Sequence, residues 1–168
     1  FIEAKSVARL NHINIVNVFD VGDNADELYI SMEYVEGKTL SEIIKSENYV
    51  FDANYTRNIA AQICSALEFA HSHNIIHRDI KPSNIMVTST GKAILTDFGL
   101  ALSVPEGTIG NTFGSAHYVA PEQAVNSAQA TAQSDIYSLG IVLFEMLTNR
   151  VPFDDPSAMA VAMKHLTD

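Results

Sequence analysis

Two stretches with apolar residues at helical spacing constrain the fold of this 168-residue chain more than any other feature. In the first, residues 55–73, the apolar positions form one stripe on an otherwise polar helix. They are Ile59, Ile63, Ala66, Leu67 and Ala70. In the second, residues 134–148, apolar side chains lie on several sides, which is typical of a central, buried helix. They include Ile136, Leu139, Leu143, Met146 and Leu147. We expect the two helices to pack against each other.

The remaining segments predict shorter elements, so the expected fold class is α+β. Residues 15–21 and 28–34 are rich in apolar residues and flank the turn-like sequence "GDNADE", which favours an antiparallel hairpin. Residues 85–87 and 93–95 predict two further strands joined by the turn "TSTGK". Residues 2–10 indicate a helix.

Two further helix starts are indicated by capping patterns. Thr39 is followed three residues later by Glu42, the spacing of a capping box in which each side chain bonds a backbone amide of the other residue. Asp155 followed by Pro156 has the pattern of an N-cap and a proline in the first helical position. We therefore expect the last helix to begin there.

Charge and cysteine content exclude several classes of protein. A formal net charge of −10, from 20 acidic and 10 basic residues, argues against a nucleic-acid-binding surface, which needs clustered Lys and Arg. The longest apolar runs, such as residues 139–144, are far shorter than the roughly 20 residues of a membrane-spanning helix. The only cysteine, Cys64, lies within the apolar pattern of the first long helix, where we expect a buried, unreactive thiol. A single cysteine cannot form an internal disulfide and favours a reducing, intracellular compartment.

Three short motifs follow one another between and after the predicted strands. The sequence "HRDIKPSN" occupies residues 77–84, "DFG" occupies residues 97–99, and "APE" occupies residues 120–122. Their order and spacing resemble the catalytic loop, the metal-binding motif and the end of the activation segment of protein kinases. In the amino-acid sequence around these motifs, the chain is most similar to the eukaryotic-like serine/threonine kinases of bacteria.

The resemblance implies a protein-kinase-like fold of two lobes. Residues 1–34 would form the C-terminal part of the small lobe, with a helix and two strands. Residues 35–38 would be the hinge, and residues 39–168 the mostly helical large lobe, incomplete at its C-terminus.

The resemblance also implies transfer of the γ-phosphate of ATP to Ser or Thr hydroxyls of protein substrates, with Mg²⁺ as a cofactor. Asp79 would accept or orient the hydroxyl proton, and Lys81 would face the transferring phosphate. Asn84 and Asp97 would supply oxygen ligands to Mg²⁺. The position of Lys81 favours Ser/Thr over Tyr specificity.

Nucleotide contacts are implied upstream of the catalytic motifs. The backbones of Glu33 and Val35 would bond the adenine edge, Met86 would form the apolar floor under the base, and Met32 would guard the pocket behind it. Ordinary core packing is the alternative for the two methionines. Glu3 corresponds to the helical glutamate that pairs with a strand lysine and so positions the phosphates.

Regulation and docking are implied by residues around the activation segment. Arg78 beside Asp79 resembles kinases in which a phosphate on the activation segment pairs with this arginine. Thr108 and Thr112 are the candidate phosphosites, with an ordinary flexible loop as the alternative. Ser115 would face the catalytic aspartate in the peptide-docking loop. The implied partners are protein substrates and a second copy of the kinase, by self-phosphorylation in trans.

The chain departs from the family pattern in two parts. Neither the Gly-x-Gly-x-x-Gly phosphate loop nor the "V-A-I-K" strand lysine occurs in it. We therefore expect a fragment truncated at both ends, with no more than trace activity by itself. Glu122, which in the family pairs with an arginine late in the domain, is expected to lack that partner.

A binding-only role is the alternative function. A pseudokinase or scaffold module would keep the fold without the reaction, but such a module has no chemical need for Asp79, Asn84 and Asp97 together. The expected location is the cytoplasm, or the cytoplasmic side of a membrane reached through other parts of the parent protein.

Overall fold

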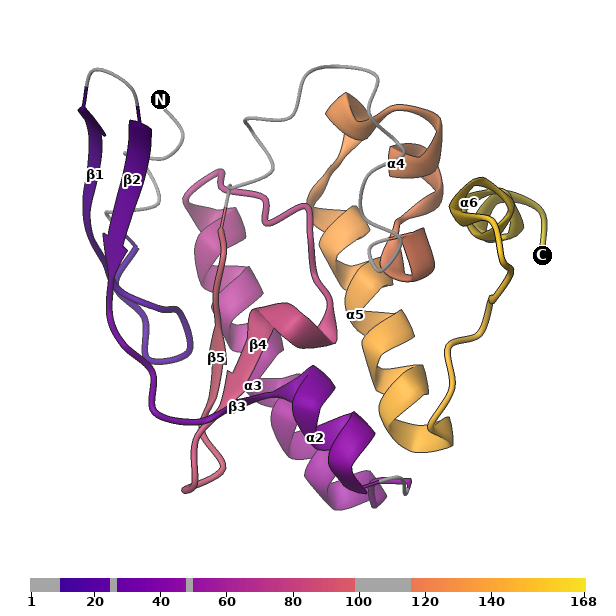
Figure 1. Cartoon of the computed structure of the whole chain (residues 1–168), viewed down its shortest axis with the longest axis horizontal. Coiled ribbons are helices and arrows are strands. Elements are labelled where there is room, and N and C mark those ends of the chain that lie inside the picture. Colours follow the sequence, from indigo (N-terminus) through magenta and orange to yellow (C-terminus); the bar gives the residue numbers. More distant parts are fainter. Residues whose placement is uncertain (1–9, 25–26, 48–49, 99–115) are drawn as a thin grey trace.

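The computed structural model describes residues 10–24, 27–47, 50–98 and 116–168 of the chain (Figure 1). Two antiparallel sheets and a set of helices make up this part. In chain order the elements are β1 (Val18–Asn24), β2 (Glu27–Met32), β3 (Lys38–Thr39), α2 (Leu40–Glu47), α3 (Ala53–Ser72), the 3-10 helix η1 (Pro82–Asn84), β4 (Ile85–Val87), β5 (Ala93–Leu95), η3 (Ala116–Tyr118), α4 (Pro121–Val125), η4 (Ser127–Gln129), α5 (Ala132–Thr148) and α6 (Ala158–Thr167). The α+β prediction is confirmed.

The first sheet is the predicted hairpin. Strands β1 and β2 pair antiparallel, with Val18 opposite Met32 and a register shift between Val18 and Asp20. In Figure 1 this hairpin stands at one side of the molecule, and the chain continues from it toward β3 and α2. The hairpin is therefore separate from the second sheet, in which β4 follows residues 77–84 and β5 precedes Asp97.

Helices α3 and α5 pack against each other at the centre of the fold, as predicted (Figure 1). Asp52 caps α3, because its carboxylate Oδ1 accepts hydrogen bonds from the amides of Asn54 (2.7 Å) and Tyr55 (2.9 Å). The whole predicted stripe of α3 is buried. Helix α5 is buried on fewer sides than expected, since Ile136 is 51% exposed and Leu147 is 43% exposed.

The second sheet has the order β3-β4-β5 and lies against α2 and α3. The predicted strands 85–87 and 93–95 coincide with β4 and β5. Gly37, just before β3, lies so close to β4 that an added Cβ atom would be 2.5 Å from the carbonyl oxygen of Val87. Only glycine allows this approach without a shift of the backbone.

The capping box at the start of α2 forms as predicted. The amide of Glu42 donates to Oγ1 of Thr39 (3.1 Å), and the amide of Thr39 donates to Oε2 of Glu42 (2.7 Å). The short segment 14–16 is tied to the second sheet, because Leu95 N donates to the carbonyl of Asn14 (2.8 Å) and Val16 N donates to the carbonyl of Leu95 (3.0 Å). The region before the hairpin is therefore anchored beside β5.

Two predictions about local structure are wrong. Cys64 is exposed, because it lies on the polar side of α3, away from the buried stripe. Helix α6 starts two residues later than expected, with Ser157 as its N-cap, and Asp155 instead accepts a hydrogen bond from the Ser157 amide (3.1 Å). The helix expected over residues 2–10 lies, apart from its last residue, outside the described residues. None of the helices in the described part is both long and apolar enough to cross a membrane.

Candidate active site

The predicted catalytic loop (residues 77–84) begins shortly after α3 and closes with η1, which leads directly into β4. Within it, Nζ of Lys81 lies 2.6 Å from Oδ2 of Asp79. The side-chain amide of Asn84 donates to the carbonyl (2.9 Å) and to Oδ2 (3.1 Å) of Asp79. The amide oxygen of Asn84 accepts a long hydrogen bond from the hydroxyl of Ser83 (3.4 Å), and its second lone pair is the group that suits a metal ion. The three polar residues predicted from the motif therefore lie together.

Asp97 is placed next to this loop by backbone hydrogen bonds. The amide and hydroxyl of Thr96 donate to the carbonyl of Asn84, over 2.9 Å and 3.2 Å. Asp97 itself has a φ of 60°, in the left-handed region. A non-glycine residue adopts this conformation at a cost of about 1–2 kcal/mol, so the surrounding contacts must impose it. The backbone of Asn84 is thus bonded to the residue that precedes Asp97.

The donor atoms at this site suit a nucleotide-bound magnesium ion. Among the described residues, no group of three or more His, Cys, Asp or Glu side chains could hold a metal ion by itself. Magnesium usually takes one or two carboxylates together with substrate phosphates and water, rather than a complete protein cage. The Asn84 amide and the Asp97 carboxylate fit that chemistry.

Asp135, in the first turn of α5, accepts hydrogen bonds from the loop of residues 77–84. The sequence analysis did not identify this residue. It is 1% exposed, and its carboxylate accepts hydrogen bonds from the amides of His77 (2.9 Å) and Arg78 (2.8 Å). Nε2 of His71 donates to it over 2.7 Å. A carboxylate in the first turn of a helix also looks like an ordinary dipole partner, so the sequence signal was weak.

Arg78 is held in an unusual conformation by these contacts. Its φ is 70°, and its carbonyl accepts a hydrogen bond from Nε2 of the buried Gln123 (3.0 Å). With Asp135 on its amide and Gln123 on its carbonyl, the backbone of Arg78 is fixed on both sides. The loop is therefore rigid at the residue just before Asp79.

His77 connects the catalytic loop to the strand that precedes Asp97. Its Nε2 donates to the carbonyl of Thr96 (2.8 Å), and its Nδ1 accepts from the amide of Asp79 (3.2 Å). The ring also packs edge-on against Phe98, with centroids 4.6 Å apart. Burial lowers the pKa of His77, which is 0% exposed, so the imidazole is neutral and serves as an orienting group.

The predicted adenine contacts lie at Glu33 and Val35, just after β2. The amide of Glu33 donates to the carbonyl of Asn17 (2.8 Å), and its carboxylate accepts from the Asn17 side chain (2.7 Å). Among the described residues, neither the carbonyl of Glu33 nor the amide of Val35 has a hydrogen-bond partner. Met86 lies in the middle of β4, opposite Thr39 and Ile94. Adenine binding by these residues stays a prediction.

Several predicted residues cannot be placed. Glu3, Thr108, Thr112 and Ser115 lie outside the described residues.

The short 3-10 helix η3 is bonded to α5, because the hydroxyl of its Tyr118 donates to Glu145 (2.6 Å). Burial, followed by this hydrogen bond, raises the pKa of Tyr118.

The carboxylate of Glu122 has a hydrogen-bond partner that the sequence analysis did not predict. The arginine partner was expected to be absent, with the carboxylate left unpaired, but the hydroxyl of Ser134 donates a hydrogen bond to Oε1 of Glu122. Ser134 also accepts from the amide of Thr131 (2.8 Å) at the start of α5. One oxygen of the carboxylate therefore has a local partner.

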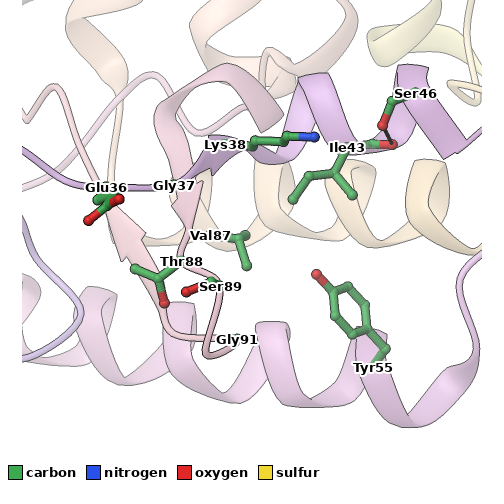
Figure 2. Close-up of a pocket in the computed structure, with 10 residues that line it drawn as sticks. All are labelled: Glu36, Gly37, Lys38, Ile43, Ser46, Tyr55, Val87, Thr88, Ser89 and Gly91. Atoms are coloured by element: carbon green, nitrogen blue, oxygen red, sulfur yellow. Dashed lines mark hydrogen bonds between the residues drawn. The ribbon is translucent and has the colours of Figure 1, made fainter.

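A separate groove of about 550 Å³ lies between residues 36–38, α2, α3 and the end of β4 (Figure 2). Figure 2 shows Lys38 and Ile43 along one side and the ring of Tyr55 across from them, with Thr88 and Ser89 at the turn after β4. None of Asp79, Lys81, Asn84 or Asp97 lines this groove. It is distinct from the place where the charged residues meet.

An aspartate, a lysine and an asparagine on one loop, beside a second aspartate at the end of a neighbouring strand, match the pattern of polar residues typical of protein kinases. The sequence model of the protein kinase domain family matches residues 1–168 of the chain. The chain therefore belongs to the protein kinase domain family. Members of this family use ATP, generally with Mg²⁺.

The chain is also similar to bacterial proteins named as serine/threonine kinases. It is 50% identical to serine/threonine-protein kinase PrkC of Bacillus subtilis over 98% of this chain and 26% of that protein. It is 47% identical to the probable serine/threonine-protein kinase PknB of Lactococcus lactis, over 99% of this chain and 27% of that protein. It is 41% identical to serine/threonine-protein kinase PknB of Mycobacterium leprae, over 99% of this chain and 28% of that protein. The chain thus spans about a quarter of the length of the curated relatives it matches.

Proposed function

We propose that the protein containing this chain is a serine/threonine kinase that transfers the γ-phosphate of ATP to hydroxyl groups of protein substrates. The observation that supports this most directly is the cluster formed by Asp79, Lys81 and Asn84, with Asp97 held beside it by Thr96. The names of the bacterial relatives support the Ser/Thr class.

In the proposed reaction the substrate hydroxyl oxygen forms a bond to the γ-phosphorus, and the bond from that phosphorus to the β,γ-bridging oxygen breaks, releasing ADP. Asp79 orients the hydroxyl and accepts its proton. Lys81 lies beside Asp79, where its ammonium group stabilises the charge on the transferring phosphoryl oxygens. Magnesium, when bound by Asn84 and Asp97, neutralises charge on the nucleotide phosphates.

Nucleotide binding and regulation complete the proposal. The backbones of Glu33 and Val35 bind the adenine edge, Met86 packs under the base, and Glu3 positions the phosphates through a lysine elsewhere in the protein.

Activation follows from phosphorylation of Thr108 or Thr112 by a second copy of the kinase, with Arg78 as the partner of the phosphate. Ser115 positions the peptide substrate next to Asp79. The fixed backbone of Arg78 supports this role, because it limits the positions that the side chain can reach. We place the kinase part in the cytoplasm or on the cytoplasmic side of a membrane.

The decisive experiment compares the full-length polypeptide that carries this chain with its Asp79→Asn and Asp97→Asn variants. Transfer of phosphate from ATP to a generic basic protein is measured with Mg²⁺ present, together with binding of ADP by calorimetry. We expect both variants to lose activity, with Asp79→Asn still binding Mg²⁺ and ADP. Equal transfer by all three proteins would exclude the proposed reaction, and nucleotide binding without transfer in the parent would favour a scaffold.

A further inference from the structure

Gln62, on the side of α3 that faces the second sheet, joins three separate segments of the chain. Its side-chain oxygen Oε1 accepts hydrogen bonds from Nδ2 of Asn14 (2.9 Å) and from the amide of Ala93 (2.8 Å). Its nitrogen Nε2 donates to Oδ1 of Asn58 (2.7 Å) and to the carbonyl of Gly91 (3.0 Å). All four hydrogen-bonding positions of the amide are therefore used.

The orientation of this amide is determined by its backbone partners. The Ala93 amide can only donate and the Gly91 carbonyl can only accept, so the oxygen and nitrogen of Gln62 cannot exchange places. Asn14, which is 6% exposed, adds a bond from its Nδ2 to the carbonyl of Ala93 (2.7 Å). Both backbone groups of Ala93 are thus held by side chains that also bond each other.

The strand held in this way leads directly to a proposed metal ligand. Ala93 is the first residue of β5, and Asp97 follows the end of that strand by two residues. Asn14 also bonds Leu95 through its backbone carbonyl, and Val16 bonds the carbonyl of the same residue. A shift of the Gln62 amide would therefore move both the start of β5 and the segment 14–16 that pairs with it.

We propose that Gln62 is a positioning residue for the binding of Mg²⁺ and nucleotide: it holds β5 and Asn14 in one register and so sets the place of Asp97. This inference rests on the proposed kinase function. The hydrogen bonds of Gln62 go to Asn14, Asn58, Gly91 and Ala93, so its effect on the site would pass through β5. A polar side chain that only covered the surface of α3 would not need four partners, two of them backbone groups at the start of β5 and in the turn before it.

The test uses variants of the full-length polypeptide that differ in how many of these bonds they keep. Gln62→Met has a similar shape and keeps none, whereas Gln62→Glu keeps acceptors for Asn14 and Ala93 and loses both donors. Asn58→Ala removes only the bond from Gln62 to its own helix. Ile63→Val, a conservative change at the neighbouring buried position of α3, serves as the control for a general loss of stability.

Two measurements separate positioning from a merely structural role. The first is calorimetric binding of ADP as a function of Mg²⁺ concentration. We expect Gln62→Met to raise the Mg²⁺ concentration for half-maximal binding by about tenfold, which is the usual size of effect for residues that orient metal ligands. We expect Gln62→Glu to lie between this variant and the parent, and Asn58→Ala and Ile63→Val to match the parent. The KM for the protein substrate should not change in any of them.

The second measurement is amide hydrogen exchange of residues 93–97 in the ligand-free protein. Faster exchange there in Gln62→Met, without faster exchange in Ile63→Val, would support the inference. An unchanged Mg²⁺ dependence in Gln62→Met, or the same change in Ile63→Val, would overturn it. If the parent binds Mg²⁺ and ADP but transfers no phosphate, the proposed function fails while the effect of Gln62 on binding is still measured.

Discussion

The carboxylate of Asp135 and the amide of Arg78 are hydrogen-bonded over 2.8 Å, although the two residues are 57 positions apart in the chain. The same carboxylate also accepts from His77, so a single side chain of α5 holds two successive amides of the catalytic loop. A backbone with a φ of 70° at Arg78 is sustained by such contacts and not by local preference. Asp135 is therefore the support on which the geometry of Asp79 depends.

Replacing Asp135 with Ala should destabilise the fold, because the buried amide of His77 and the partly buried amide of Arg78 lose their acceptor. Each orphaned amide costs about 1–3 kcal/mol of unfolding free energy. Asp135→Asn keeps one acceptor oxygen and should lose less stability. Urea unfolding followed by circular dichroism measures the difference, with Glu68→Gln on the exposed side of α3 as the control. An Asp135→Ala protein as stable as the parent would contradict this role.

Much of the fold could be predicted because its signals are local. The strands β4 and β5 are bounded by turn residues, and the buried stripe of α3 follows from helical spacing alone. The capping box of α2 likewise needs only Thr39 and Glu42. At the candidate site, Asp79, Lys81 and Asn84 lie within one loop, so their proximity follows from the motif.

The features that the sequence did not predict depend on contacts between residues far apart in the chain, or on which of two nearby residues caps a helix. Asp135 and Gln62 each have partners on other elements, and no local pattern marks them. Before α6, both Asp155 and Ser157 have side chains that can cap a helix, and Ser157, which directly precedes the first helical residue, is the N-cap. Cys64 follows the buried Ile63 directly, but one step along a helix turns a side chain by about 100°, enough to leave the core.

The N-cap of α3 should contribute measurable stability without affecting chemistry. Asp52 accepts hydrogen bonds from two amides that otherwise lack partners at the helix start. Asp52→Ala should lower the unfolding free energy by about 1 kcal/mol, whereas Asp52→Asn, also a good cap, should lose much less. Thermal unfolding of the two variants checks this. If Asn and Ala destabilise equally, the cap is not the source of the effect.

Two glycines should respond in opposite directions to replacement by alanine. At Gly37 a new Cβ atom would meet the carbonyl oxygen of Val87 at 2.5 Å, so the backbone must shift and we expect a loss of about 1–3 kcal/mol. At Gly140, inside α5, a Cβ atom meets nothing within 4 Å. Alanine there should stabilise the helix by about 0.5–1 kcal/mol. Urea unfolding of both variants in the same background tests the contrast, which a destabilised Gly140→Ala would refute.

Stability should fall as the pH drops below the ordinary pKa of histidine, and His165 should account for part of the loss. This side chain is 6% exposed, its Nδ1 lies 2.8 Å from the hydroxyl of Tyr137, and Phe153 packs against its ring. Burial lowers the pKa of His165 in the folded protein. The unfolded chain therefore binds protons first as the pH falls through about 6.5, which favours unfolding.

Above about pH 7.5 both states carry a neutral imidazole, and the contribution of His165 no longer depends on pH. His165→Gln cannot titrate and still offers an acceptor to Tyr137, so its unfolding free energy should vary less between pH 5 and 7 than that of the parent. The difference in slope must be below about 1.4 kcal/mol per pH unit, the limit for one proton. His77, whose pKa burial also lowers, keeps part of the pH dependence in the variant. Identical slopes for the two proteins in urea unfolding across this range would show that His165 takes up its proton equally in both states.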